Sequence, residues 1–259
     1  GMLPVSFPSL QKLNTFVVAI YDEVRGKYVY LDGSMDVPAL NVLPVELSVT
    51  KARILSADIP ENKKWVNLQE IPTNQIFMKI SANAQGNQIT GRRTTILKGY
   101  DALEYRKEYQ TKDSLVNKQE LVKEKLAISN LKRTEMEDDF ATIQEDFDFI
   151  LEAEKSEDHI YINPMLFPQL TKNPFIQSER ILPVEFPYLY RLNLSCALTL
   201  PEGYEVEEIP HSQVVKTEDG KLQCKYMIQR NGNNVIVNYS FSLNSSVMPS
   251  EYYSQLQEI

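Results

Sequence analysis

Residues 191–200 read Arg-Leu-Asn-Leu-Ser-Cys-Ala-Leu-Thr-Leu, and this alternation decides the fold of the chain. The apolar side chains stand at every even position, so an extended backbone places them on one face, with the other side chains on the opposite face. A half-buried antiparallel strand produces this pattern. The strand lies in the stretch from Ile160 to Pro210, which is rich in Asn-Pro and Pro-containing turns, and the remaining chain is organised around it.

The same alternation recurs on both sides of this stretch. Residues 222–228 and 235–243 are separated by Asn231-Gly232, a pair typical of a tight hairpin turn. Upstream, residues 76–82 and 89–97 flank Gly86 and predict another hairpin. Residues 147–153 also alternate with a period of two. The sequence therefore predicts a mainly β protein whose strands form an antiparallel β-sandwich.

One segment of the chain changes character. From Tyr100 to Leu126 it is rich in Lys, Glu, Gln and Leu, contains no Gly or Pro after its start, and spaces its apolar residues as a helix does. We predict a helical insertion at about 100–126 within a sandwich domain spanning residues 67–259. Residues 1–66 form a separate part, with a hairpin expected from Leu13–Ile20 and Tyr28–Leu31.

Composition excludes some classes of function. The chain has 259 residues and a net charge of -8, whereas binding to a phosphate backbone needs a clustered basic surface, so no nucleic-acid partner is expected. No apolar run approaches the ~20 residues of a membrane-spanning helix, so no transmembrane segment is predicted. No signal peptide is recognisable. Gly1 before Met2 resembles an expression-tag scar, which leaves open that the natural chain extends further.

Catalytic side chains are few. His159 and His211 are the two histidines, and Cys196 and Cys224 are the two cysteines, both on the apolar faces of predicted strands. A bridge between the two cysteines stays open from the sequence. The acids from Glu135 to Asp158 lack the loop spacing of an EF-hand, and no glycine-rich phosphate loop occurs. We expect no cofactor and no metal.

A family resemblance adds to this interpretation. The segment Asn14–Val18, followed by Tyr28–Ser34, resembles the last hairpin of a transglutaminase-like core, in which a Cys–His–Asp triad acts as in papain-type proteases. Asp32 matches the position of the aspartate, and Thr15 occupies the position of the histidine. The cysteine of such a core would lie upstream of this chain. The resemblance thus implies kinship with an enzyme but assigns no complete triad here.

The later part of the chain strengthens the resemblance. It is similar to the β-rich domain of unknown function that follows the core in large bacterial transglutaminase-like proteins, through Asn163-Pro164, Asn173-Pro174-Phe175, Glu179-Arg180, Pro183-Val184-Glu185-Phe186 and Leu200-Pro201-Glu202-Gly203-Tyr204-Glu205-Val206. Residues 1–66 then correspond to a remnant of the core and a linker. The resemblance alone implies an extracytoplasmic location.

Three functions remain open at this point. The first is a non-catalytic accessory or binding module, whose partner is a protein or a glycan bound through exposed sheet edges. The alternative is the C-terminal fragment of a cysteine-dependent acyl transferase or protease whose catalytic cysteine lies upstream. The third is a self-contained hydrolase that uses Cys196 or Cys224 as its nucleophile.

Overall fold

The computed structural model describes residues 15–35, 38–49, 51–60, 63–69, 73–109, 125–136, 139–170 and 172–259. The chain divides into two compact units between Pro72 and Thr73, whereas the sequence suggested a boundary after Val66. The two units are described separately below.

The first unit is built around a short hairpin. Strand β1 (Val18–Asp22) pairs antiparallel with β2 (Lys27–Leu31), and Gly26 in the turn has a positive φ of 64°. The hairpin is the one expected from the sequence. A short 3-10 helix η2 (Val45–Leu47) and the two-residue strands β3 (Ala52–Arg53) and β4 (Trp65–Val66) follow. Tyr30, Leu43 and Leu68 form the buried centre of this unit.

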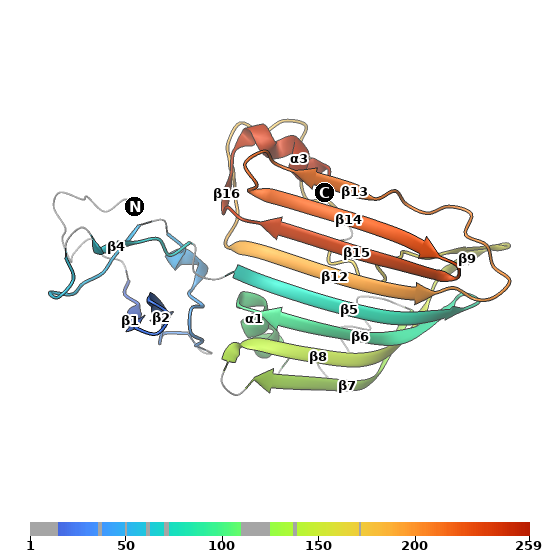
Figure 1. The fold of residues 1–259 in the computed structure, drawn as a ribbon, viewed down its shortest axis with the longest axis horizontal. Coiled ribbons are helices and arrows are strands. Elements are labelled where there is room, and N and C mark those ends of the chain that lie inside the picture. The colour runs from blue at the N-terminus through green and yellow to red at the C-terminus, as the bar shows by residue number, and fades with distance from the viewer. Residues whose placement is uncertain are drawn as a thin grey trace. The chain divides into compact units, whose positions relative to one another are not determined.

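The second unit is dominated by one eight-stranded sheet, in the order β13-β14-β15-β12-β5-β6-β8-β7 (Figure 1). The prediction of a mainly β protein is confirmed, with 49% strand and 10% helix. The strands of the sheet are β5 (Thr73–Gln85), β6 (Gln88–Lys98), β7 (Leu126–Met136), β8 (Asp139–Glu152), β12 (Leu189–Thr199), β13 (Gln213–Lys216), β14 (Leu222–Asn231) and β15 (Asn234–Leu243).

The arrangement of these strands differs from two packed antiparallel sheets. These eight strands form a single mixed sheet, because β12 runs parallel to β5 while every other neighbouring pair within it is antiparallel. A parallel pair requires a long crossover between its strands. Residues 153–188 provide the connection from β8 to β12 on the other side of β5, so two antiparallel halves meet at the β5–β12 pair.

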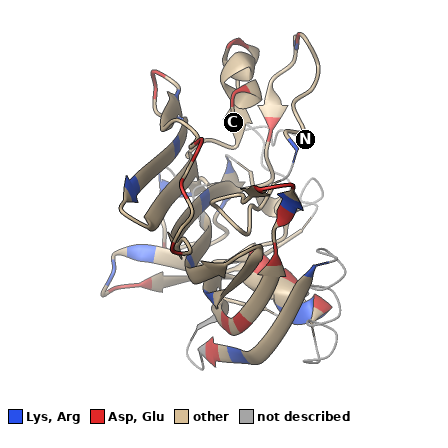
Figure 2. Cartoon of the chain, turned by 90° about the vertical axis from the view of Figure 1, so that its right-hand side faces the viewer, with Lys and Arg blue, Asp and Glu red and all other residues tan. Residues whose placement is uncertain are grey.

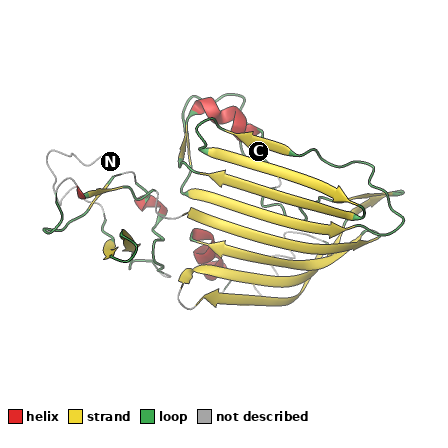
Figure 3. Cartoon of the chain, in the orientation of Figure 1, coloured by secondary structure: helices red, strands yellow, loops and turns green. Residues whose placement is uncertain are grey.

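In the described part of the chain, helix α1 and the irregular segment after β10, and not a second sheet, cover the core face of the sheet (Figure 3). The segment contains prolines at 164, 168 and 174, which lack the backbone donor that a central strand needs. Its Phe167 packs edge-on against Phe147 and Phe149, with ring centroids 6.1 and 5.0 Å apart. Leu166 is buried in the same cluster.

The helical insertion begins at the residue that the sequence predicts, Tyr100. Helix α1 (Tyr100–Glu108) buries Ala102, Leu103 and Tyr105, but the predicted end at Leu126 is wrong, because Leu126 begins strand β7. Residues 110–124 lie outside the described residues. Strand β7 pairs with β8 and is interrupted by a bulge between Ser129 and Lys132, where Asn130 has a positive φ of 53°. The bulge and the three charged residues Lys132, Arg133 and Glu135 obscured strand β7 in the sequence.

Short elements complete the second unit. Strands β9 (Glu154–Ser156) and β10 (His159–Tyr161) form a small hairpin, and β11 (Val184–Glu185) pairs with β16 (Val247–Met248). The chain then continues through a 3-10 helix η4 (Ser250–Tyr252) into helix α3 (Tyr253–Gln257). Tyr253 and Leu256 close a second apolar cluster at this end of the sheet.

Candidate functional site

A cleft of about 1210 Å³ lies beside the β9–β10 hairpin. Three further regions of the second unit contribute to it: the Gly86 turn, the loop after β12 from Leu200 to Pro210, and the strand residues Leu198, Ile228 and Val235 of β12, β14 and β15. The loop contains two prolines, Pro201 and Pro210, and a turn in which Gly203 has a positive φ of 83°, so it leaves the sheet as an irregular wall. The cleft therefore combines segments that are far apart in the sequence.

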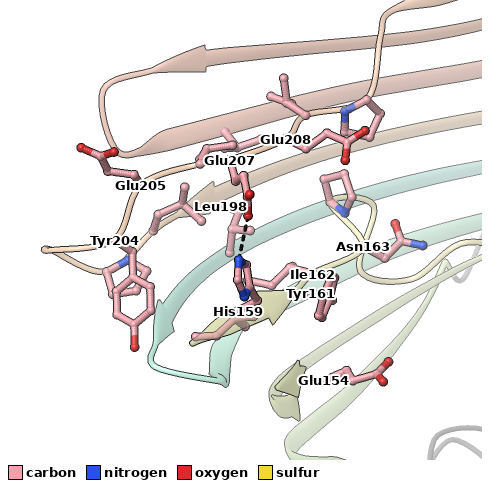
Figure 4. A pocket seen from close by; sticks show the side chains of 18 of the residues that line it. Glu154, His159, Tyr161, Ile162, Asn163, Leu198, Tyr204, Glu205, Glu207 and Glu208 are labelled. Carbon is pink, nitrogen blue, oxygen red and sulfur yellow. Dashed lines mark ion pairs between the residues drawn. The ribbon is translucent and has the colours of Figure 1, made fainter. Parts of the chain in front are cut away.

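His159 and Glu207 face each other across this cleft (Figure 4). The Nε2 atom of His159 lies 2.9 Å from Oε2 of Glu207, and the imidazole also stacks beside Tyr161 at 6.5 Å between ring centroids. Both side chains are more than half exposed, so their pairing contributes little to stability, about 0–1 kcal/mol. The pairing links the β10 strand to the loop after β12.

The lining of the cleft is acidic above an apolar floor. Its floor includes Leu198 and Val235, which belong to the buried core. Five carboxylates line it: Glu154, Asp158, Glu205, Glu207 and Glu208. The described lining contains no Lys or Arg and no Cys, Ser or Thr. The His159–Glu207 pair therefore has no serine, threonine or cysteine nucleophile in that lining to activate.

A second cluster of ionisable groups is buried under helix α1. Arg93 of β6 donates from Nη2 to Oε1 of Glu145 at 2.5 Å, and the Tyr105 hydroxyl donates to Oε2 at 2.6 Å. The guanidinium also lies over the rings of Phe147 and Phe167, 4.3 and 5.0 Å from their centroids. Both Glu145 oxygens are thereby satisfied, which fixes α1 to the sheet.

Burial shifts the pKa values of this cluster. It lowers the pKa of Arg93, although the adjacent Glu145 carboxylate opposes the shift. Burial also raises the pKa of Tyr105, and the Glu145 carboxylate adds to that rise. The tyrosine is therefore a neutral donor and the arginine keeps a partner for its charge, as a structural network requires.

Both cysteines are free and buried. Cys196 pairs with Val237 and Cys224 with Phe241, so β15 separates them by two strand spacings, about 10 Å, and by four residues along the strand. A disulfide needs Cα atoms within about 7 Å, so this separation excludes a bridge. Burial raises the pKa of Cys196 to about 12 and also raises that of Cys224. Neither cysteine lines the cleft.

The cleft lining does not include Asp32, Thr15 or His211, the other residues that the sequence singled out. Asp32 is buried at the end of β2, and its Oδ1 accepts a hydrogen bond from the backbone N–H of Ser34 at 2.8 Å, which is the contact of an Asx turn. Thr15 is exposed, as is His211. The sequence pointed to the turn at Pro201–Tyr204 but missed the acidic cleft. The available signal was the run of glutamates between Pro201 and Pro210.

No metal site emerges from the described part of the chain, where His, Cys, Asp and Glu never gather in a group of three or more suited to an ion. Among the helices in the same part, none has the length and apolar character needed to cross a membrane.

The comparison with known protein families gives a match to the C-terminal part of the chain. No curated protein and no solved structure matches the chain. The match covers β10 through α3 and thus the β12–β15 half of the sheet, together with most of the cleft lining. Residues 158–259 match the family described as Domain of Unknown Function with solved-structure structure (DUF3858).

Proposed function

We propose that this chain is a non-catalytic accessory module of a transglutaminase-like protein, and that its acidic cleft holds a segment of a protein partner. The observation that carries the proposal is the described cleft lining, which offers five carboxylates above an apolar floor and no Cys, Ser or Thr nucleophile. Such a surface suits recognition better than acyl transfer, which needs a nucleophile beside its base.

The chemistry of the cleft selects its occupant. Since its described lining carries five carboxylates and no Lys or Arg, a bound segment gains from positive charges, which also accelerate its association. The floor formed by Leu198 and Val235 favours apolar side chains in the same segment. An extended peptide that alternates basic and apolar residues presents both at once, because successive side chains point to opposite sides.

A sheet edge beside the cleft supports the same proposal. Strand β13 follows Pro210 closely, pairs only with β14 among the described strands, and exposes Val214. A bound segment that continues along β13 could add a strand to the sheet. Edge β7, in contrast, is protected by its bulge and its charged side chains, two features that discourage pairing with another chain.

A peptide-binding experiment tests this function. Two fluorescent decapeptides, one alternating lysine with valine and the other glutamate with valine, are titrated with the whole chain in fluorescence polarisation at fixed ionic strength. We expect only the lysine peptide to bind. The variant Glu205→Gln/Glu207→Gln/Glu208→Gln should weaken its binding at least tenfold.

The matched control changes the same net charge elsewhere. The variant Glu23→Gln/Glu46→Gln/Glu218→Gln removes three exposed carboxylates outside the cleft and should alter the affinity less than twofold. Equal affinity for both peptides, or an equal loss in both triple variants, would contradict the proposed cleft function.

The alternative function is the C-terminal part of a cysteine-dependent acyl transferase or protease. It is favoured by Asp32, a buried carboxylate at the end of the β1–β2 hairpin, where the resembling family places its aspartate. The test is the gene sequence upstream of Met2. An in-frame cysteine-bearing segment would allow the longer protein to be assayed with Asp32→Asn, which should abolish activity if Asp32 completes a triad.

A further inference from the structure

The sheet face opposite helix α1 carries a separate hollow of about 550 Å³. Helix α1 contacts the core face through Asn74 and Glu145, whereas Phe77, Lys79 and Thr94 point to the other face. The hollow spans the five central strands from β14 to β6. It is thus formed by the most extensively paired part of the sheet and not by loops.

Strand register arranges the side chains of this hollow into two rows. One row crosses the sheet through Met227, Asn238, Ser195, Lys79 and Thr94. The neighbouring row contains Lys225, Ser240, Asn193, Phe77 and Ile96. The two lysines therefore lie in different rows and three strands apart, which is about 14 Å across the strands and about 7 Å along them.

The charge of the hollow is opposite to that of the chain. Lys79 and Lys225 are the charged side chains of its lining, both are exposed, and neither forms an ion pair with a described residue. The whole chain carries a net charge of -8, so this positive pair is a local exception. Asp146, next in the first row, already accepts hydrogen bonds from Thr94 and Gln144. An anionic ligand complements this surface.

The polar groups between the lysines specify the ligand further. Asn193 and Asn238 each offer an amide donor and acceptor, and Ser195 and Ser240 add hydroxyls. None of these four side chains hydrogen-bonds to a described residue. Phe77, 38% exposed, presents an aromatic surface beside them. Amides and hydroxyls can bond the many hydroxyl groups of a sugar, and an aromatic ring can pack against the apolar C–H face of a sugar ring.

We propose that this hollow binds an acidic oligosaccharide, independently of the cleft. The lysines pair with carboxylates on separate sugar units, the asparagines and serines bond the hydroxyls, and Phe77 packs against a sugar ring. A nucleic acid fits less well, because its phosphates require a continuous basic surface. In Figure 2, basic and acidic residues are instead interspersed along the strands.

Isothermal titration calorimetry on the whole chain tests the proposal at fixed ionic strength. The probes are hexagalacturonate, maltohexaose as its neutral counterpart of equal length, and a six-nucleotide oligothymidylate as a non-sugar anion. We expect hexagalacturonate to bind and the other two to bind at least tenfold more weakly. Absence of hexagalacturonate binding, or equal binding of the oligothymidylate, would overturn the proposal.

Variants separate recognition at the hollow from general charge attraction. Lys79→Gln/Lys225→Gln should raise the Kd for hexagalacturonate at least tenfold, and Phe77→Ala, which changes no charge, should raise it severalfold. The control Lys155→Gln/Lys216→Gln removes two exposed lysines outside the hollow and should change the Kd less than twofold. An equal loss in the control, or no effect of Phe77→Ala, would refute the assigned site.

Discussion

At the scale of single residues, the buried pair of Arg93 and Glu145 governs how helix α1 is held to the sheet. Both side chains are almost completely buried, and the pair is completed by Tyr105 and two aromatic rings. Removal of one partner from such a pair leaves an uncompensated buried charge, whereas replacement of both by apolar groups can be nearly neutral. Removal of one partner should therefore lower the free energy of unfolding much more than replacement of both partners by apolar residues.

We predict that Glu145→Ala lowers the free energy of unfolding by about 3–5 kcal/mol, measured by urea denaturation. The double variant Arg93→Met/Glu145→Leu should recover most of that loss. Arg92→Ala is the control, because Arg92 is exposed and makes only a 3.6 Å ion pair with Asp148, and it should cost less than about 1 kcal/mol. Equal losses for Glu145→Ala and Arg92→Ala would show that the buried network is unimportant.

The two cysteines give a second prediction at this scale. Because both are buried and their pKa values are raised, almost no thiolate is present or accessible near neutral pH. Iodoacetamide at pH 8 should therefore leave the native chain unmodified and label two cysteines after unfolding in urea, as counted by mass spectrometry. Rapid native labelling of either cysteine would instead revive a hydrolase with that residue as nucleophile.

Cys196 also predicts a dependence of stability on pH. Its thiol keeps the proton up to a pH of about 12 in the folded chain but titrates near a pH of about 8.5 in the unfolded chain. The unfolded state therefore loses a proton first, and stability falls between these two values by up to ~1.4 kcal/mol per pH unit. Urea titrations at pH 8 and 10 should show a smaller fall for Cys196→Ala than for the natural chain, and equal falls would contradict this account.

At the scale of elements, strands β5, β6 and β8 approach closely at Gly91. A Cβ atom at this position would lie 2.4 Å from the carbonyl oxygen of Ser81 and 2.8 Å from the Phe149 ring, and the backbone oxygen cannot move alone. The glycine is required by this contact and not by its φ. It permits the ring of Phe149 to pack over the sheet.

Gly91→Ala should therefore destabilise the second unit by about 1–3 kcal/mol, because the added methyl group overpacks the core. The comparison is Gly86→Asn in the β5–β6 turn, where nothing lies within 4 Å and the positive φ of 59° is one that asparagine tolerates. We expect Gly86→Asn to change the urea midpoint much less. A neutral Gly91→Ala would indicate that the strands separate more easily than this packing implies.

Elements with a local signal could be predicted from the sequence. The hairpins at Gly86 and Gly232 combine alternation with a turn residue, and both glycines have the positive φ that the turns require. Strand β7 had no such signal, because its bulge breaks the alternation and its face is charged. The parallel pairing of β5 with β12 depends on segments more than a hundred residues apart, which no local pattern encodes.

At the scale of the whole molecule, the candidate sites follow from register. The rows that include Lys79 and Lys225 exist only because four strands align in one way, and a shift by one residue would turn each side chain to the other face. The cleft likewise collects residues from Gly86 to Val235. The sequence could indicate that strands alternate, but it could not indicate which side chains become neighbours.

The division of the chain leads to the last prediction. The apolar clusters around Phe147, Ala102 and Leu222 lie entirely after Thr73, and β5 begins at that residue. A chain truncated to residues 73–259 should therefore fold alone, with a cooperative urea transition and circular dichroism typical of strands.

A chain of residues 81–259 is the matched control, because it removes half of β5, which lies between β6 and β12, and with it the buried Ile76, Met78 and Ile80. It should lose the transition. A non-cooperative 73–259 chain would mean that the first unit is needed for the sheet to fold, and equal behaviour of both truncated chains would mean that β5 does not join the two halves.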